Sequence, residues 1–501
     1  MNKLKETKSL CPECHKLIPA TIFEEDDRVL LEKSCPEHGY FSDVYWGDYE
    51  QYKRVINFEN MGVKLHNPRT KTDKGCPYDC GICPEHNSHT ILAIIDITNR
   101  CNLRCPICFA HAGAAGYLYE PTKEQIKDML EDLRSNKPVP PPALQFSGGE
   151  PTVREDLPEL VSMAKKLGFE HVEVNSNGIK FAESVEYCKT LKESGVSTIY
   201  LQFDGVNAEP YIVARGFDLL PIKMKALANL KEAGFRSVVL VPVLVKGVND
   251  NQVGDIIRFA IENRDIVRGV NFQPVSITGR INRSEREKMR ITIPDLMKLV
   301  EEQTGRLITR DDWYPIPTVI PLTRLIGKLK GRSYVDFSVH PHCGMATYIV
   351  MNKDKPEPIT RYLNVEGFLQ TIKHASKLAD EGHKTRAKME IGASALKNIN
   401  FGMLRKYLLP VIWKGSYDSL SNLHHKMILI GAMHFMDPYN FDVERVNRCT
   451  IHYATPDKRI IPFCTMNTLH RKGIEQKFSQ PLEASKITPL YDIKEFLNKN
   501  K

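Results

Sequence analysis

The chain has 501 residues, of which 42% are hydrophobic and 26% are charged, and its formal net charge is +8. This length suits two or three domains, and the composition is that of an ordinary folded enzyme. The sequence has neither a long uninterrupted apolar run nor an apolar N-terminal segment. We therefore expect no transmembrane helix, no secretory signal and a cytoplasmic protein. The positive charge fits an ordinary basic surface or attraction to an anionic partner, and does not choose between them.

The thirteen cysteines are more informative than the charge. Disulfides are disfavoured in a reducing cytosol, so clustered cysteines indicate metal binding. Cys188 is the exception. It lies in "ESVEYCKTLKES", which has the pattern of an amphipathic helix, and we expect it in the core.

Residues 1–60 form the first expected domain, a small metal-binding module. "CPEC" and "CPEHG" place Cys11, Cys14, Cys35 and His38 in a C-x₂-C…C-x₂-H pattern. Such ligands are typical of a treble-clef or rubredoxin-like site for one zinc or iron ion in tetrahedral coordination. His38 is the weakest of the four and could instead support a ligand without binding the metal.

Residues 61–90 form a cysteine-rich linker. "CPYDCGICPEH" places Cys76, Cys80 and Cys83 at C-x₃-C-x₂-C spacing, with His86 three residues after the last cysteine. Three close thiolates beside the next domain favour an auxiliary iron–sulfur cluster, and zinc is the alternative.

Residues 91–305 alternate short apolar runs with segments whose apolar residues recur every three or four positions. This pattern predicts a parallel sheet with helical crossovers, in an α/β partial (βα)₆ TIM-like barrel or a full barrel with two weak units. Chemistry in such folds lies at the C-terminal ends of the strands. We expect strands at 91–98, 143–147, 171–176, 198–204, 237–245 and 269–275, and helices at 122–135, 154–168, 220–234 and 251–264.

Directly after the first expected strand, "CNLRCPIC" places Cys101, Cys105 and Cys108 at C-x₃-C-x₂-C spacing. Three thiolates can hold three irons of a [4Fe–4S] cluster and leave the fourth iron open. A zinc site with a distant fourth ligand is the alternative. The position of the loop at the C-terminal end of a strand favours the cluster.

The same end of the barrel carries "SGGEP", "NSNG" and "FDG", each after a later strand. Together with "CNLRCPIC", these motifs resemble those of radical S-adenosylmethionine (SAM) enzymes over residues 91–305. The resemblance implies that the open iron binds SAM, whose reductive cleavage gives a 5′-deoxyadenosyl radical. It assigns catalytic roles to Cys101, Cys105 and Cys108.

The resemblance also implies a set of cofactor-binding residues. Gly148, Gly149 and Glu150 would meet the methionine amino group, and Ser176 and Asn177 would contact the ribose, although ordinary turn residues are the alternative for this pair. Ile107 stands where the family usually has an aromatic residue over the adenine. Gln202 and Asp204, at the end of the fourth expected strand, complete the expected set.

Residues 306–501 are expected to form an auxiliary-cluster and substrate-binding region. Cys343, Cys449 and Cys464 are far apart in the sequence. The segment "PDKRIIPFC" is similar to pieces by which many radical SAM enzymes hold auxiliary clusters. We expect the three cysteines to converge, with His452, His342 or a non-protein ligand completing the site.

The complete layout resembles that of the archaeal tetraether lipid synthases, a group earlier named dihydro-hydroxymethylpterin methyltransferases. The resemblance implies coupling of the terminal carbons of two isoprenoid chains of archaeol phospholipids, with two SAM molecules used for each carbon–carbon bond. It also implies one or two auxiliary iron–sulfur clusters, a mononuclear iron or zinc, and an external low-potential electron donor such as ferredoxin. Nucleic acid is not an expected partner, whereas peripheral contact with the inner face of the membrane is.

A basic segment at 384–406 agrees with an anionic lipid headgroup as ligand. Its expected substrate-binding residues are Lys384, Arg386, Lys388 and Arg405, accompanied by Lys397 and Lys406. Apolar runs at 407–415 and 424–436 follow it, too short to cross a bilayer, and could line a tunnel for isoprenoid chains. A solvated helix face followed by ordinary core helices explains these residues equally well.

Two other classes of function remain open at this point. A radical SAM enzyme could act on a small polar substrate, as a pterin C-methylase or a peptide-modifying maturase. A zinc-dependent nucleic-acid-binding protein would account for the cysteines and the charge, but it leaves "SGGEP" and the open cluster loop unexplained.

Overall fold

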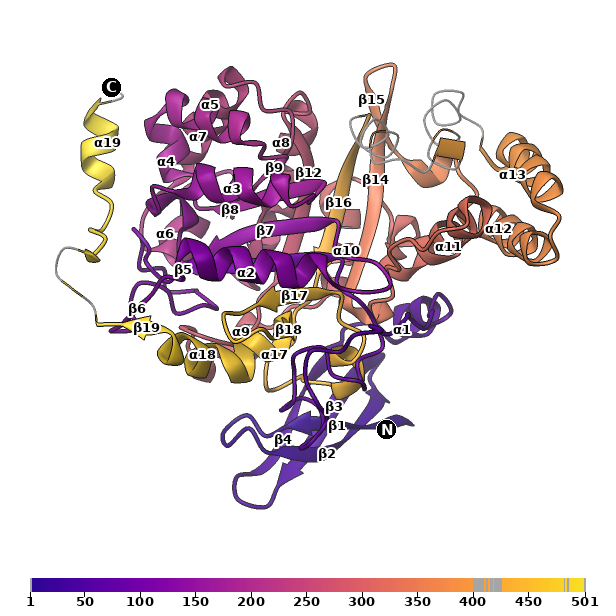
Figure 1. Cartoon of the computed structure of the whole chain (residues 1–501), viewed down its shortest axis with the longest axis horizontal. Coiled ribbons are helices and arrows are strands. Elements are labelled where there is room, and N and C mark those ends of the chain that lie inside the picture. Colours follow the sequence, from indigo (N-terminus) through magenta and orange to yellow (C-terminus); the bar gives the residue numbers. More distant parts are fainter. Residues whose placement is uncertain are drawn as a thin grey trace.

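One mixed β-sheet forms the centre of the computed structural model (Figure 1), which describes residues 2–399, 410, 413, 414, 418, 426–481, 483 and 486–499. The six strands predicted for residues 91–305 are present and pair in parallel in chain order. They are β5 (Leu92–Thr98), β7 (Ala143–Gly148), β8 (His171–Ser176), β9 (Thr198–Gln202), β10 (Val238–Val241) and β12 (Val267–Pro274).

Helices follow these strands and cover the sheet, as the helical periodicity predicts. Their apolar faces are buried, and Cys188 is fully buried among them, as expected for a core cysteine. The first helix begins at a capping box in which Thr122 and Gln125 each bond the other's backbone amide. The helices are α2 (Lys123–Arg134), α3 (Leu157–Lys166), α4 (Ile179–Glu183), α5 (Val185–Ser194), α6 (Glu209–Arg215), α7 (Leu220–Glu232) and α8 (Val253–Glu262).

The C-terminal region extends the sheet on both sides. Strand β16 (Met427–Met433) pairs in parallel with β12, and β17 (Ile451–Ala454) pairs in parallel with β5. Eight neighbouring strands of the described chain thus run parallel, so the two strands beyond the (βα)₆ unit come from beyond residue 305. The alternative of an ordinary core helix within 424–436 is wrong for residues 427–433, which form a strand between two others.

Antiparallel strands complete this sheet at its two ends. Strand β14 (Gly344–Asn352) is antiparallel to β16 and pairs with β13 (Tyr314–Pro315) and β15 (Lys355–Pro358). Strand β18 (Ile460–Pro462) is antiparallel to β17. The chain then forms α17 (Phe463–Thr465), a π-helical turn (Met466–His470) and α18 (Arg471–Lys477).

The N-terminal module is a separate antiparallel sheet that projects from the central one (Figure 1). Its strands are β1 (Asn2–Leu10), β2 (Leu17–Glu25), β3 (Arg28–Cys35) and β4 (Gly39–Trp46), followed by α1 (Tyr49–Ile56). Its core includes Ile22, Leu31 and Trp46, which are fully buried. Tight turns at 11–14 and 35–38 bring the metal-ligand motifs to the same end of this sheet.

Buried polar contacts fix the module to the rest of the chain. Arg290 bonds Asp43 of β4 at 2.9 Å and Asp437, which follows β16, at 2.7 Å. Lys33 of β3 donates to the carbonyl oxygens of Pro438 and Tyr439 at 2.6 and 2.9 Å. The same segment after β16 is therefore held by contacts that involve two strands of the module, β3 and β4.

Helices α11 (Ile320–Lys330), α12 (Val365–Asp380) and α13 (Lys384–Asn398) pack together at the outer edge of the molecule, and α19 (Ile493–Lys499) lies at the opposite edge (Figure 1). Among the described residues, none of the helices has the length and apolar character needed to cross a membrane.

Candidate active site and metal centres

The loop with Cys101, Cys105 and Cys108 follows β5 and is joined to the next strand end through its backbone. The amides of Gly149 and Glu150 donate to the carbonyl oxygens of Thr98 and Arg100 at 2.8 and 2.9 Å. This contact explains the two glycines of "SGGEP". A Cβ on Gly148 would lie 2.1 Å from Thr98 O, and one on Gly149 would lie 2.1 Å from Arg100 O. The glycines thus permit two strand ends to touch.

Arg215, at the end of α6, holds the other side of the cysteine loop. Its guanidinium forms two hydrogen bonds with Asp204, at 2.7 and 2.8 Å, and donates to the Ile107 carbonyl at 3.0 Å. The Ile107 amide in turn donates to Ala214 O at 3.3 Å. All of these groups are buried. A planar guanidinium that bridges a carboxylate and a carbonyl fixes the loop in one position.

Burial raises the pKa of Cys101 well above its usual range, and it also raises the pKa of Cys105. Thiols of this kind stay protonated in a free protein, and metal coordination removes their protons. The ligands of one metal ion lie close together. Among the described residues, the three loop sulfurs do not form a group in which all ligand atoms lie within 4.8 Å of one another. A cluster, in which each thiolate binds a different iron, fits this wider spacing.

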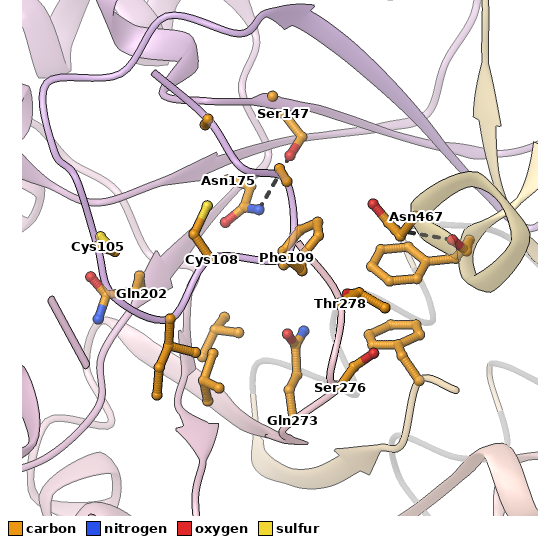
Figure 2. A pocket seen from close by; sticks show the side chains of 18 of the residues that line it. Cys105, Cys108, Phe109, Ser147, Asn175, Gln202, Gln273, Ser276, Thr278 and Asn467 are labelled. Carbon is orange, nitrogen blue, oxygen red and sulfur yellow. Dashed lines mark hydrogen bonds between the residues drawn. The ribbon is translucent and has the colours of Figure 1, made fainter. Parts of the chain in front are cut away.

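A cavity of about 190 Å³ lies beside the three cysteines and is lined differently on its two sides (Figure 2). The barrel strands contribute polar side chains, which include Ser147, Glu150, Asn175, Ser176, Gln202 and Gln273. Ser276 and Thr278, which follow β12, lie beside an apolar wall that comes from the cysteine loop and the C-terminal region. It comprises Phe109, Met433, Phe435, Met436, Tyr453 and Phe463, with Asn467 beside them.

Glu150 is the buried carboxylate of this cavity. Its Oε1 accepts from Thr152 and Ser176 at 2.6 and 2.8 Å, and its Oε2 accepts from the Asn177 amide at 2.7 Å. Burial raises the pKa of Glu150 even though these bonds favour the ionised form. A carboxylate oxygen can accept two hydrogen bonds, so Oε2 has the capacity to receive an ammonium group.

The N-terminal quartet has the geometry of a site for a single ion. The ligand atoms of Cys11, Cys14, Cys35 and His38 all lie within 4.8 Å of one another. The sulfurs of Cys14 and Cys35 are 3.9 Å apart, close to the ~3.8 Å that Zn–S bonds of ~2.3 Å in a tetrahedron require. His38 Nδ1 is 3.5 Å from Cys35 Sγ. Its hydrogen bond lowers the pKa of Cys35 to about 6.

The linker cysteines Cys76, Cys80 and Cys83 are all buried next to the C-terminal segment. The pKa of Cys80 is lowered to about 6, mainly by a hydrogen bond with Cys76 and in smaller part by the ring of His470. His470 also bonds the Pro77 carbonyl through Nε2 at 3.1 Å. His86, the histidine nearest in sequence, instead bonds Cys449 O at 2.8 Å. The structure therefore brings His470, and not His86, beside these thiols.

Cys343 affects the pKa of both Cys449 and Cys464, so the C-terminal cysteines lie close together. Burial raises the pKa of Cys449 to about 12, and Cys343 and Cys80 add to this rise. Burial also raises the pKa of Cys464, with contributions from Cys449 and Cys343. The Met436 amide donates to Cys464 Sγ at 3.3 Å. Met436 lines the cavity, so the C-terminal triplet lies behind its apolar wall.

The two histidines expected beside this triplet have other partners. His452 lies 3.2 Å from His86 between their Nε2 atoms, and His342 Nε2 lies 3.3 Å from the Tyr52 carbonyl. The His342 ring also stacks on Tyr52, with 4.2 Å between the ring centroids. Arg445 is a side chain that does contact a sulfur of the triplet, because its Nε donates to Cys343 Sγ at 3.2 Å.

The amino-acid sequence matches those of known protein families. Residues 95–260 match the radical SAM superfamily model, and residues 3–47 match the HMPTM N-terminal zinc ribbon domain. The 7,8-dihydro-6-hydroxymethylpterin dimethyltransferase of Methanocaldococcus jannaschii is 55% identical over 493 residues, which cover 96% of each chain. The chain belongs to the radical SAM superfamily.

More distant similarities cover the central part of the chain. The GTP 3′,8-cyclase of Clostridium acetobutylicum is 25% identical over 238 residues, 47% of this chain and 69% of that protein. The structure of Streptococcus suis SuiB bound to precursor peptide SuiA has a TM-score of 0.36 at 18% identity, covering 44% of this chain and 47% of that chain. The similarity to the first relative thus extends over nearly the whole of this radical SAM protein, and the similarity to the other two extends over about half of it.

The residues expected to bind the radical SAM cofactors are placed as follows. Cys101, Cys105, Cys108 and Ile107 lie in one loop, and they line the cavity together with Gly148, Gly149, Glu150, Ser176, Asn177 and Gln202. Asp204 is fully buried in its ion pair with Arg215 and is absent from the described lining. Its direct contact with a cofactor stays a prediction.

The expected substrate-binding cations lie elsewhere. Lys384, Arg386 and Lys388 are exposed on α13 and do not belong to the described lining of the cavity. Arg405 and Lys406 lie outside the described residues, while Lys397 is exposed. A headgroup-binding role for this segment stays a prediction.

Sequence reasoning missed Arg215, Arg445 and the aromatic wall around Phe463. Phe435 stacks on Phe463 with ring centroids 3.8 Å apart, and Phe109 lies 5.7 Å from Phe463. These aromatic residues come from three separate segments, so no local pattern joins them. The one available signal is position, because Phe109 and Phe463 each directly follow or precede a candidate ligand cysteine in the sequence.

Proposed function

We propose that this radical SAM enzyme forms carbon–carbon bonds between the terminal carbons of isoprenoid chains of archaeol phospholipids and so makes tetraether or macrocyclic lipids. The observation that carries the proposal is the apolar half of the cavity. Its wall of Phe109, Met433, Phe435, Met436 and Phe463 lies in the same cavity as the three loop cysteines, and these side chains offer a saturated chain end apolar contacts.

The residues of the polar half suit the cofactors. Cys101, Cys105 and Cys108 would hold the cluster, and the free capacity of Glu150 Oε2 suits the amino group of SAM. When bound, these cofactors supply a 5′-deoxyadenosyl radical for each electron accepted, and two such radicals remove one hydrogen atom from each of two methyl groups so that the two carbons can join. The apolar wall would orient the methyl group and exclude water, which protects a reactive carbon.

A lipid substrate also agrees with the position of the C-terminal cysteine triplet next to the apolar wall. Cys464 follows Phe463 directly, and the Met436 amide bonds its sulfur. The end of an isoprenoid chain that contacts Phe463 and Met436 would lie between the three loop cysteines and the C-terminal triplet. We propose that Cys343, Cys449 and Cys464 hold an auxiliary iron–sulfur cluster there, and that Cys76, Cys80 and Cys83 hold another.

Methylation of a pterin is the second candidate function, and the printed name of the Methanocaldococcus jannaschii relative favours it. A pterin ring could stack on the aromatic residues around Phe463. Its many nitrogen and oxygen atoms would need hydrogen-bond partners, however, and the side chains of Phe435, Met436 and Phe463 offer none. The polar side chains that line the cavity near this wall are Ser276, Thr278 and Asn467. The alkyl substrate therefore fits the apolar half better.

The experiment that separates the two candidates is mass spectrometry of ligands extracted from the protein after anaerobic purification from a host that makes archaeol phospholipids. Lipids with C20 isoprenoid chains, depleted when Phe463 is replaced by Glu, support the proposal. Binding of 7,8-dihydro-6-hydroxymethylpterin without retention of lipid would contradict it. Phe259→Leu, at a side chain stacked on Phe203 in the main hydrophobic core, serves as the control.

A further inference from the structure

Arg445 is a buried guanidinium beside the C-terminal cysteine triplet. It lies on α16 (Val443–Val446) and is 1% exposed. Its Nε donates to Cys343 Sγ at 3.2 Å, and its Nη2 donates to His434 O at 2.8 Å. The third nitrogen, Nη1, has no hydrogen-bond partner within the described part of the chain.

The charge of Arg445 lacks the usual compensation. In the part of the chain that the structure describes, no carboxylate forms an ion pair with it, although Arg448, three residues later, is paired with Glu59. The ring of Tyr45 lies 5.5 Å from the guanidinium carbon and offers a weak attraction. Burial of an uncompensated cation costs several kcal/mol, so an anion is expected at this place.

The thiols of the triplet are the groups that can supply this anion. The guanidinium stays protonated at any physiological pH. Cys343 and Cys464 both raise its pKa, which places both sulfurs within its electrostatic reach. Thiolates that bind iron carry negative charge, and the open Nη1 could reach a further sulfur of the same centre. The residues present therefore fit an iron–sulfur cluster at this triplet.

We infer that Arg445 is the counter-charge and hydrogen-bond donor of the metal centre held by Cys343, Cys449 and Cys464, and that it raises the reduction potential of this centre. Reduction adds negative charge to a cluster, and a buried cation stabilises the more negative form. Hydrogen bonds to the sulfurs act in the same direction. Arg445 is thus a positioning residue that favours electron transfer toward the triplet. The inference rests on the iron–sulfur assignment and not on the identity of the substrate.

The test is a redox titration followed by electron paramagnetic resonance on anaerobically reconstituted full-length protein. Cys101, Cys105 and Cys108 are replaced by Ala in every sample to remove the radical cluster, and a Cys464→Ala sample identifies the signal of the triplet. We expect Arg445→Gln to shift the midpoint potential of that signal to a lower value. The remaining cluster should keep its potential, because its ligands Cys76 and Cys80 are not bonded by Arg445.

The matched control is Arg134→Gln. Arg134 also donates to a backbone carbonyl, that of Pro141 at 3.0 Å, and also lies over an aromatic ring, that of Phe169 at 5.3 Å. This control should leave both potentials unchanged. An unchanged potential in a fully loaded Arg445→Gln protein overturns the inference. If that variant does not retain the cluster, Arg445→Lys, which loses the Nε–H bond to Cys343, is measured in its place, and a wild-type potential then overturns it.

Discussion

At the scale of single residues, the position of the cysteine loop depends on contacts with the neighbouring strand end and with Arg215. The Gly148–Gly149 pair allows the backbone of the next strand end to lie against Thr98 and Arg100. Arg215 fixes the opposite side through Asp204 and the Ile107 carbonyl. The loop is therefore positioned before any ligand binds, which lowers the entropic cost of binding.

The first prediction concerns the three loop cysteines. Replacing Cys105 by Ala should abolish formation of 5′-deoxyadenosine from SAM, because one of the three iron ligands is lost. The product is measured by liquid chromatography under anaerobic, reducing conditions. Cys188→Ala is the control, since this fully buried cysteine belongs to the main hydrophobic core, and it should retain the activity. Product formation by the Cys105 variant would refute the radical mechanism.

The second prediction concerns Gly149. A Cβ there would lie 2.1 Å from Arg100 O, so Gly149→Ala should force the two strand ends apart and destabilise the protein by about 1–3 kcal/mol. Binding of SAM, measured by calorimetry, should weaken with it. Gly473→Ala provides the comparison. Its Cβ would meet no atom within 4 Å and it lies inside α18, so it should be neutral or stabilising by up to ~1 kcal/mol. Equal effects of the two substitutions would contradict this account of the strand contact.

Sequence reasoning predicted candidate ligand residues but not the residues that support them. Cysteine spacing and glycine-rich strand ends are local signals, so Cys101 and Glu150 could be predicted. Arg215 and Arg445 could not, because each acts on a partner about one hundred residues away or more. Glycine at "SGGEP" suggested a close approach, and the structure identifies the Thr98 and Arg100 backbone as the neighbour.

At the scale of elements, the N-terminal module is tied to the wall of the cavity. Arg290 connects Asp43 of the module with Asp437, and Asp437 accepts from the Ile277 amide at 2.8 Å. Ser276 and Thr278, which flank Ile277, line the cavity. A change in the module can therefore reach the active site through a short chain of buried contacts.

The third prediction tests this connection. Asp43→Asn removes the charge that faces Arg290 and should destabilise the protein by about 3 kcal/mol, since one partner of a buried ion pair is lost. The midpoint of thermal unfolding reports the change. Glu50→Gln breaks the exposed pair with Lys53 and should cost at most ~1 kcal/mol. A smaller effect for Asp43→Asn than for Glu50→Gln would show that the buried contact does not hold the module.

The fourth prediction concerns the metal of the module. Cys14→Ala removes one of four ligands whose atoms all lie within 4.8 Å of one another, so the variant should lose one metal ion per chain. Elemental analysis together with a sulfide determination measures this loss. The sulfide content should stay unchanged, because a mononuclear site contains no inorganic sulfide. A parallel fall in sulfide would contradict a single-ion site.

The elements of the (βα)₆ unit could be predicted because each strand and helix shows its own periodicity. All six expected strands are present within a few residues, and the four expected helices correspond to α2, α3, α7 and α8. The sequence alone did not predict that β16 and β17 belong to the same sheet. They lie more than one hundred residues beyond β12 along the chain, and the apolar run of β16 has the same composition as a buried helix.

At the scale of the whole molecule, the cavity joins two regions of different chemistry. The barrel supplies polar groups and the three loop cysteines (Figure 2), and the C-terminal region supplies most of the apolar wall. Cys464 accepts a hydrogen bond from the amide of Met436, a residue of that wall. Both regions belong to one sheet, since β16 and β17 extend the barrel on its two sides. The continuous sheet therefore holds the two sulfur-ligand sites in a fixed relation across the cavity.

The most direct test of the proposed lipid coupling is a single anaerobic reaction that contains the reconstituted enzyme, a reductant, SAM and archaeol phospholipid. The lipid product is analysed by mass spectrometry, and 5′-deoxyadenosine is counted in the same sample. The account predicts a joined lipid that has lost two hydrogen atoms for each new bond, with two molecules of 5′-deoxyadenosine formed. A methylated pterin from a parallel reaction with 7,8-dihydro-6-hydroxymethylpterin, and an unchanged lipid, would contradict it.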